Sequence, residues 1–361
     1  MGKGLCWQFM DSPPSMDLQN EWNRLCENNP YSCASSYPVF TDGSIFLLGN
    51  AKIIYAYAYK DKQLICAIPL FLKQKRFCFL NIKVLQIINH DHLDLHVIAG
   101  QNLWQINDLV ESLFVAIKSK LKGWDYFQAR NLYLDKSILN GYRVQFYQKK
   151  SAYFNIHNLD SINKVIPKKL LKNINRHQKK IKAEEGNLSL ECLKPHDDVI
   201  TALDKFMDIE NSGWKGEANT SISSLNETSE FYTKLWDEYS KLGKAQIYIL
   251  YLNGASIAGA ISFKHETTIY LHKIAYLDSF KAYSPGSILI KMILESAIEK
   301  NTISRICLNT NPKWVNRWHP DILMLDAIEC FNLTLKGQML KQLLFLYRSV
   351  KTLKAYIKNY K

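Results

Sequence analysis

The stretch IYLHKIAYLDSFKAYSPGSILIKMILESAI, residues 269–298, predicts an aromatic-rich strand, a short loop and an apolar helix. Two independent signals agree on the helix start, since Ser284 occupies the N-cap position and Pro285 the first helical position. The next amides lack partners inside a helix, and the helix dipole adds positive charge around them. The stretch is therefore either an ordinary helix cap or a phosphate site built on the amides of Gly286, Ser287 and Ile288.

Further motifs surround this stretch in one order along the chain. They are ExxGWKG at residues 210–216, TSI at 220–222, FY at 231–232, NGxxIAGAISF at 253–263, YLHKIAYLDSF at 270–280 and SPGSIL at 284–289. In this order they resemble the acetyltransferases of the GNAT superfamily typified by the CelD-like proteins of cellulose and exopolysaccharide biosynthesis. The resemblance covers residues 161–318 well and the N-terminal part more loosely.

This resemblance implies an acyl-CoA co-substrate, acetyl-CoA in the simplest case, at the SPGSI motif. Transfer from a thioester to an amine requires a neutral amine, because a protonated amine has no lone pair to attack. Glu210 is the leading candidate for the base by its position in ExxGWKG, with Trp214 and Lys215 beside it. The alternative is structural: Glu210 neutralises Lys215 or the basic helix, and Trp214 anchors the core.

The strand before the SPGSI motif carries further candidates for catalysis, namely His272, Lys273 and Tyr276. In a GNAT fold this strand diverges from its neighbour, so that the pantetheine arm bonds to its backbone and an amide polarises the thioester oxygen. Strand alternation places Tyr270, His272, Ile274 and Tyr276 on one face and Lys273 on the other. A Tyr or His there could protonate the leaving thiolate, or could only pack against the helix.

The sequence departs from the family pattern in two places. Tyr283 stands where a basic or Gln residue is common, and Ile288 where a second small residue is common. CelD-like sequences usually carry acidic residues at the positions of Asn309 and Asn311, so a catalytic role is not expected there. Lys313 and Arg317, in the same segment, remain able to meet phosphate.

The length of 361 residues exceeds one typical core, and 47% apolar residues suffice to bury two. The order of elements predicts an α/β (α+β) protein with tandem GNAT-like domains, each a mixed, mostly antiparallel sheet flanked by helices. The expected divisions are a degenerate GNAT-like domain at residues 1–160, a GNAT acyltransferase domain with the cofactor motif at 161–330, and a basic amphipathic helix at 331–361.

Within the first half, alternating elements are expected. The expected helices are residues 16–27 and 103–121, and the strands are 45–48, 53–59, 64–72, 76–80, 93–97 and 126–129. Residues 60–63 form a polar hairpin tip. No glycine-rich turn follows these strands, so no cofactor is expected in this half.

The net charge of +13 is concentrated in two predicted helices. Residues 164–182 contain eight Lys or Arg and no acid, and residues 336–361 contain seven and no acid. Each suits a polyanion, an anionic membrane or a phosphorylated ligand, or is a solvated face. The second is amphipathic, which predicts either docking on the protein body or peripheral contact with an anionic membrane.

The run HDHLDLH at residues 90–96 is the most metal-like in the chain. On a strand, His92, Asp94 and His96 would share one face, and their side chains are suited to zinc. The alternative is a polar strand that lines a cleft. The second interpretation is preferred, so no metal is expected. The eight cysteines show no zinc-like spacing. No apolar segment reaches about 18 residues and no signal peptide is recognised, so a cytoplasmic location is expected.

These features predict an acyl-CoA-dependent N-acyltransferase that transfers its group directly to an amine, since no Ser-His or Cys-His arrangement suggests a covalent intermediate. The resemblance implies an amino-sugar precursor of a surface polysaccharide as the acceptor. One alternative is a Fem-type aminoacyl transferase that uses charged tRNA, although the coiled-coil insertion usual in that type is absent. Another is a non-catalytic GNAT-fold scaffold that binds a membrane or nucleic acid.

Overall fold

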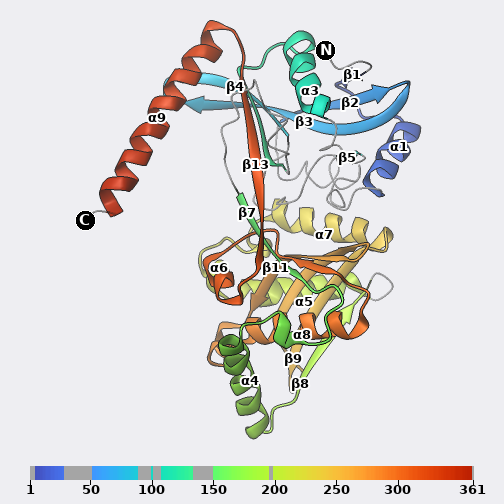
Figure 1. Ribbon diagram of the computed structural model, residues 1–361, viewed down its shortest axis with the longest axis vertical. Helices are drawn as coiled ribbons and strands as arrows, with labels where there is room; N and C mark the ends of the chain where they lie inside the picture. The colour runs from blue at the N-terminus through green and yellow to red at the C-terminus, as the bar shows by residue number, and fades with distance from the viewer. Residues whose placement is uncertain are drawn as a thin grey trace. The chain divides into compact units, whose positions relative to one another are not determined.

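The computed structural model describes residues 5–27, 51–87, 99–100, 107–132, 149–194 and 198–359. The chain divides into two compact units. Unit 1 holds the described residues from 5 to 132, Lys149 and residues 325–359, and unit 2 holds those from 150 to 324. Residues 325–359, at the far end of the chain, thus belong to the same unit as its beginning (Figure 1).

Unit 1 is a mixed sheet with strands in the order β1, β2, β3, β4, β6, β13. Only β4 and β6 pair in parallel among these neighbours; the other pairs are antiparallel. The elements are β1 (Leu5–Met10), α1 (Met16–Glu27), β2 (Lys52–Lys60), β3 (Gln63–Phe77), β4 (Leu80–Ile87), β5 (Ala99–Gly100), α3 (Asn107–Lys120), β6 (Tyr126–Leu132), β13 (Asp321–Phe331) and α9 (Leu335–Asn359).

Local turn signals place the first hairpin correctly. Asp61 and Lys62 both have positive φ, at 49° and 68°, which closes the tight turn between β2 and β3 that the polar tip predicts.

The predicted strand at residues 76–80 is wrong, because β3 ends at Phe77 and Cys78 turns the chain with φ of 52°. The predicted elements at residues 45–48 and 93–97 lie outside the described residues, as does the HDHLDLH run.

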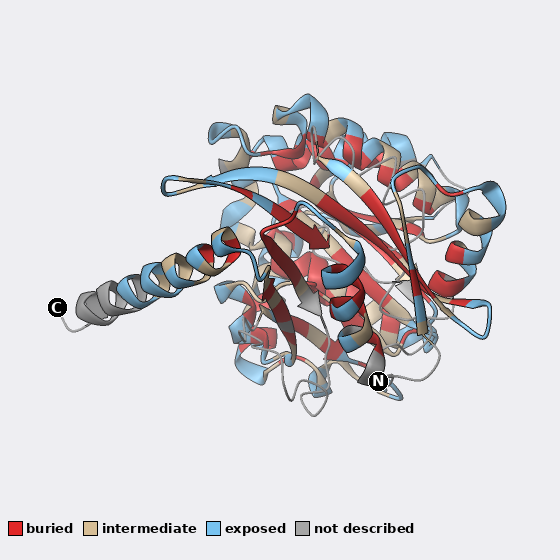
Figure 2. Cartoon of the chain, turned by 90° about the horizontal axis from the view of Figure 1, so that it is seen from above, coloured by how far each residue is buried: buried red, intermediate tan, exposed pale blue. Residues whose placement is uncertain are grey.

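The last helix begins on the surface of its own unit. Leu340 is fully buried against β4 and β6, and Arg348 donates two hydrogen bonds of 2.9 Å to the carboxylate of Glu329 on β13. Tyr126 donates to the same carboxylate at 2.5 Å. Burial, and then the charge and hydrogen bond of Glu329, raise the pKa of Tyr126. Most described residues of α9 beyond Phe345 are exposed (Figure 2).

Unit 2 is also a mixed sheet, with strands in the order β7, β12, β11, β10, β9, β8, and only β11 and β12 pair in parallel. Its strands are β7 (Lys149–Asn155), β8 (Leu188–Leu193), β9 (Ala245–Leu252), β10 (Ala255–His265), β11 (Thr268–Tyr276) and β12 (Arg305–Cys307). Its helices are α4 (Lys168–Ala183), α5 (Val199–Asn211), α6 (Trp214–Glu217), α7 (Asn226–Lys241) and α8 (Pro285–Lys300). Short 3-10 helices are η4 (Ile162–Lys164), η5 (Ile222–Ser224), η6 (Asp278–Tyr283) and η7 (Lys313–Trp318).

Helices cover both faces of this second sheet. On one face, Phe263 of β10 stacks on Tyr239 of α7 with ring centroids 4.9 Å apart. On the other face, Ala258 and Ala260 of β10 join one apolar cluster with the buried residues of α8 and α4. Both units are therefore mixed, mostly antiparallel sheets flanked by helices, as the order of elements predicts. Among the helices that the structure describes, none combines the length and apolarity that a membrane span requires.

Candidate active site in the second unit

A β-bulge interrupts β11 at His272. Lys273 pairs with Ile261 of β10, and Leu271 pairs with the next residue, Ser262, so His272 is the extra residue between them. A bulge of this kind shifts the alternation of side chains by one position and bends the strand. The two halves of β11 therefore present their side chains in different phases.

The predicted common face for Tyr270, His272, Ile274 and Tyr276 is wrong because of this bulge. Tyr270 stacks on Phe263 and the ring of His272 lies 5.7 Å from that of Trp236, both on the α7 side of the sheet. Ile274 packs instead against the apolar cluster beneath α8, and Tyr276 lies against Gly286. Lys273, paired with Ile261, lies opposite Ile274 but on the same face as Tyr270 and His272, so its predicted separation from those two residues is also wrong.

The two parallel strands in the middle of the sheet, β11 and β12, separate after a short paired segment. The β11 and β12 ladder runs from Thr268 to Tyr270 and from Arg305 to Cys307 and then ends. From Leu271 to Tyr276, this edge of β11 has no strand beside it among the described residues. Its backbone groups can therefore receive an extended ligand by adding hydrogen bonds in the manner of a strand.

A cavity of about 440 Å³ opens at the end of β11, where α8 begins; we call it the α8 cavity. Its lining residues come from β11, η6, the first turns of α8, and η7. They are Ile274, Tyr276, Lys281, Ser284, Pro285, Gly286, Ser287, Ile290, Trp314 and Arg317. Of the five residues predicted to bind the cofactor, four line this cavity, whereas the fifth, Ile288, is fully buried in the core.

The amides at the start of α8 are less open than the sequence predicts. Ser287 and Ile288 both donate their N–H groups to the carbonyl of Ser284, at 2.9 and 3.2 Å. Within the part of the chain that the structure describes, the Gly286 amide has no such partner. Pro285 is the first helical residue, as predicted, but the side chain of Ser284 does not cap the helix, since that residue is left-handed with φ of 55°. One amide, rather than three, is available to an anion.

Arg317 supplies a positive charge beside that amide. Its guanidinium donates a 2.8 Å hydrogen bond to the hydroxyl of Ser287, in the first turn of α8. Trp314 and Arg317 lie three residues apart in η7, and this spacing puts both side chains on one side of a 3-10 helix. Arg317, which the sequence predicts can meet phosphate, therefore has a defined position at the α8 cavity. Lys313, for which the same role was predicted, does not line this cavity.

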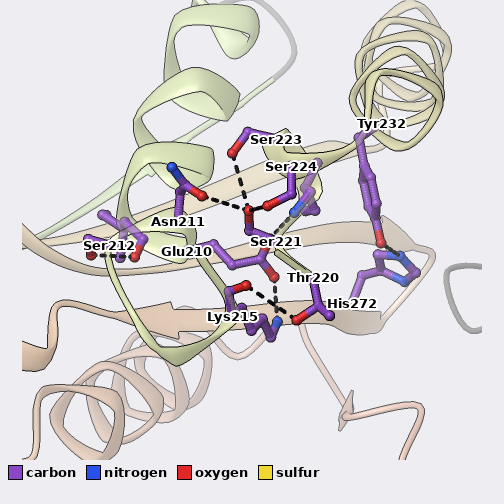
Figure 3. A network of polar contacts seen from close by, with 12 residues as sticks. Glu210, Asn211, Ser212, Lys215, Thr220, Ser221, Ser223, Ser224, Tyr232 and His272 are labelled. Atoms are coloured by element: carbon purple, nitrogen blue, oxygen red, sulfur yellow. Dashed lines mark hydrogen bonds and ion pairs between the residues drawn. The ribbon is translucent and has the colours of Figure 1, made fainter. Parts of the chain in front are cut away.

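Glu210, the predicted base, is buried at the end of α5. One of its carboxylate oxygens pairs with the ammonium of Lys215, and the other accepts the backbone N–H of Ile222 at 2.8 Å (Figure 3). Its side chain is 2% exposed, compared with 25% for that of Lys215. The carboxylate thus ties the segment after α5 to η5, and both of its oxygens are engaged. Trp214 begins α6, and its side chain lies outside the described structure.

His272 belongs to the same polar region, on the α7 side of β11. Its Nε2 lies 3.1 Å from the hydroxyl of Tyr232 (Figure 3). The FY motif indicated Tyr232 by sequence but did not indicate this partner, which depends on the bulge. The structure therefore separates the predicted catalytic residues, because His272 lies on the α7 face while Tyr276 lines the α8 cavity.

Asn309 follows β12 at the point where β12 separates from β11. The sequence did not predict a functional role for this residue. Asn309 is 8% exposed, has φ of 56°, and its side-chain amide nitrogen has no hydrogen-bond partner in the described structure. The side-chain oxygen of Asn311 is also without one. Buried amides of this kind are usually satisfied, so they are candidates to contact a ligand. Among the described residues, no group of three or more His, Cys, Asp or Glu could hold a metal ion.

Comparison with known proteins finds a family that matches part of the second unit. Residues 168–313 match the acetyltransferase (GNAT) domain family. This segment runs from the first residue of α4 to the first residue of η7, so it includes β11, the start of α8 and the segment of Glu210. A GNAT domain takes an acyl-CoA as co-substrate. No curated protein matches the chain in sequence.

Solved structures extend the likeness to nearly the whole chain. FemX has a TM-score of 0.59 at 10% identity, over 93% of this chain and 99% of FemX. L-PGS from Bacillus licheniformis has a TM-score of 0.51 at 12% identity, over 94% and 98% of the two chains. The C-terminal domain of a protein described as a lysylphosphatidylglycerol synthetase from Agrobacterium fabrum reaches 0.53 at 11% identity, over 86% and 92%.

At such identities these structures show the fold alone, which is the tandem GNAT-like arrangement that the order of elements predicts. The family match adds the class of chemistry and the co-substrate. Residues 168–313 carry an acetyltransferase domain of the GNAT type, and the chain is an acyltransferase.

Proposed function

We propose that the chain transfers an acetyl group from acetyl-CoA to the amine of an acceptor. The α8 cavity carries this proposal, because it places the Gly286 amide and Arg317 beside the open edge of β11. An anion is favoured at a helix N-terminus with a cation next to it. The pyrophosphate of the co-substrate would lie there, and its pantetheine arm would run along residues 271–276.

The reaction needs three contributions from the protein. A backbone N–H of β11 stabilises the charge that develops on the thioester oxygen as the amine nitrogen attacks the carbonyl carbon. The C–N bond forms, the C–S bond breaks, and the leaving sulfur takes a proton, for which Tyr276 in the α8 cavity is the candidate donor. The amine loses its proton to a base, with Glu210 as the candidate and Lys215 as its ion-pair partner.

The acceptor we favour is an amino sugar, on the way to a surface polysaccharide, in line with the CelD-like order of motifs. A release assay for the free thiol of coenzyme A, run with acetyl-CoA and a panel of amines, tests this directly. Release that requires an amino sugar supports the proposal. Absence of release with every amine, together with absence of acetyl-CoA binding in calorimetry, would contradict it.

A second candidate is a Fem-type aminoacyl transferase, which the likeness to FemX over 99% of that chain favours. This reaction would use charged tRNA in place of acetyl-CoA and would still deliver an acyl group to an amine. Incubation with aminoacyl-tRNA and measurement of ester loss separates the two candidates. Thermal stabilisation by acetyl-CoA but not by tRNA favours the first, and the reverse favours the second.

A further inference from the structure

A second cavity, of about 630 Å³, lies between the first half of α4 and the end of η7; we call it the α4–η7 cavity. Among the described residues that line it, half are cations and none carries a carboxylate. The cations are Lys169, Lys172 and Arg176 from α4 and Arg317 from η7, and the other lining residues are Pro167, Leu170, Asn173 and His319. Charge of a single sign around one concave site points to an anionic ligand.

The sequence of α4 explains why its cations gather there. Lys169, Lys172 and Arg176 are spaced by three and four residues, so they share one face of the helix. The opposite face is apolar and packs into the core, with Leu171 and Ile174 both buried. The fold therefore directs the three positive charges away from the core and toward η7.

No acidic side chain in the described ranges pairs with these three cations. In the described part of the chain, the ion pairs of α4 and its approach involve Lys164 and Lys180, and none involves Lys169 or Lys172. Arg176 donates one hydrogen bond, of 2.9 Å, to the neutral side chain of Asn173. Like charges at these helical spacings repel one another, and a bound anion would relieve that repulsion.

His177 follows Arg176 directly in α4. The pKa of His177 is lowered, first by burial and then by the charges of Arg176 and Lys180. This lowering accords with the excess of cations along α4.

Arg317 joins the two cavities. It lines both of them, and its hydrogen bond to Ser287 fixes the guanidinium at the start of α8. A ligand that places one phosphate against Gly286 can therefore place a second phosphate in the α4–η7 cavity without leaving the reach of Arg317. If two separate ligands bind instead, the one in the α4–η7 cavity would lie next to the one in the α8 cavity.

We propose that the α4–η7 cavity binds a phosphate ester group of a substrate, held by Lys169, Lys172 and Arg176 next to the acyl-transfer site. This inference rests on the proposed function and specifies its substrates further. The phosphate ester has two sources with the same chemistry. It belongs either to the co-substrate, as the 3′-phosphate of coenzyme A, or to a phosphorylated amine acceptor.

The test compares two double variants of α4 with the same loss of charge. Lys169→Gln with Lys172→Gln removes two cations from the cavity. Lys179→Gln with Lys182→Gln removes two exposed cations from the same helix that do not line it, and serves as the control. All four side chains are exposed, so both variants are expected to fold, and thermal unfolding verifies this.

Calorimetry with acetyl-CoA and its 3′-dephospho form tests the first source. If the co-substrate fills the cavity, the wild type prefers acetyl-CoA by about tenfold or more, since charge-assisted hydrogen bonds of this kind are strong. The cavity variant then loses this preference, and the control variant keeps it.

Titration of inorganic pyrophosphate into protein saturated with acetyl-CoA tests the second source. If the acceptor fills the cavity, the saturated wild type and control variant bind pyrophosphate, and the cavity variant binds it about tenfold more weakly. If both double variants behave like the wild type in both titrations, the inference is overturned.

A failure of the proposed function remains distinguishable from a failure of this inference. Should no form of the protein bind acetyl-CoA, pyrophosphate is titrated into the unliganded proteins. Weaker binding by the cavity variant alone then upholds the phosphate site while the acetyl transfer fails. Equal binding by the two double variants overturns the phosphate site as well.

Discussion

The guanidinium of Arg317 donates a 2.8 Å hydrogen bond to the hydroxyl of Ser287, which joins η7 to the first turn of α8. The two residues are far apart in sequence, yet their contact puts a fixed cation beside the Gly286 amide. A fixed charge of this kind binds an anion with less loss of side-chain entropy than a free one.

Replacement of Arg317 by Gln is expected to weaken acetyl-CoA binding by about tenfold or more, because it removes a cation that lines both cavities. Lys313→Gln is the matched control, since Lys313 belongs to the same 3-10 helix but lines neither cavity. Isothermal titration of both variants measures the effect. Equal affinities in the two variants would show that charge loss at Arg317 is irrelevant to the ligand.

Gly286→Val is expected to narrow the α8 cavity and to weaken acetyl-CoA binding. A Cβ atom at this position would lie 3.3 Å from Cδ1 of Tyr276, so a branched side chain must displace that ring. The double variant Gly286→Val with Tyr276→Ala removes the obstacle and is expected to regain part of the affinity. If the second substitution restores nothing, crowding against Tyr276 is not the cause.

Glu210→Ala is expected to lower the free energy of unfolding by about 3 kcal/mol, because it leaves the partially buried Lys215 and the Ile222 amide without their partner. Glu210→Gln keeps an acceptor for Ile222 and is expected to cost only about 1 to 2 kcal/mol. Urea unfolding of the two variants measures these values.

The same pair of variants separates a catalytic role of Glu210 from a structural one. As a general base, Glu210 is expected to contribute about a hundredfold or more to kcat. Glu210→Gln should then lose this factor while it binds acetyl-CoA as the wild type does, and Lys215→Met should lose much less. Near-normal turnover in a folded Glu210→Gln variant would exclude Glu210 as the base.

The pH dependence of stability is expected to reflect Tyr126. Burial and the Glu329 carboxylate raise its pKa above the ordinary 10.0, so the folded chain keeps a proton that the unfolded chain has already released. The stability contributed by Tyr126 is complete below about pH 10 and is lost as the pH rises further.

Tyr126→Phe should therefore lower Tm at pH 8, through the lost hydrogen bond to Glu329, and the deficit should shrink above pH 10. Thermal unfolding of the variant and the wild type from pH 8 to 11 checks this. Parallel curves across that range would rule out titration of Tyr126 as a source of the alkaline loss.

The exposed part of α9 is expected to bind anionic membranes peripherally. Met339, Leu346 and Val350 lie on one stripe of the helix and are each about half exposed, in a segment rich in Lys and Arg. Sedimentation with vesicles that contain phosphatidylglycerol should show binding that weakens as salt is added. Leu346→Ser with Val350→Ser should reduce it. Equal binding to neutral phosphatidylcholine vesicles would contradict the electrostatic part of this prediction.

Local sequence signals explain several features of the second unit. Pro285 begins α8 as predicted, and Asn253 and Gly254, which open the NGxxIAGAISF motif, turn the chain between β9 and β10 with positive φ at both positions. Caps and tight turns depend on residues only a few positions apart, so their physical causes are contained in a short stretch. The order of these elements was sufficient to indicate the tandem GNAT-like fold.

The tertiary structure decided what depends on partners distant in sequence. The extra residue at His272 follows from the register of β11 against β10, which alternation within one strand cannot reveal. The charge beside Gly286 comes from η7, and β13 returns the end of the chain to the first unit. The sequence alone therefore determined many of the elements and, through the resemblance of its motifs, the class of chemistry. Packing between distant segments determined which side chains share a cavity, because no short-range rule specifies those contacts.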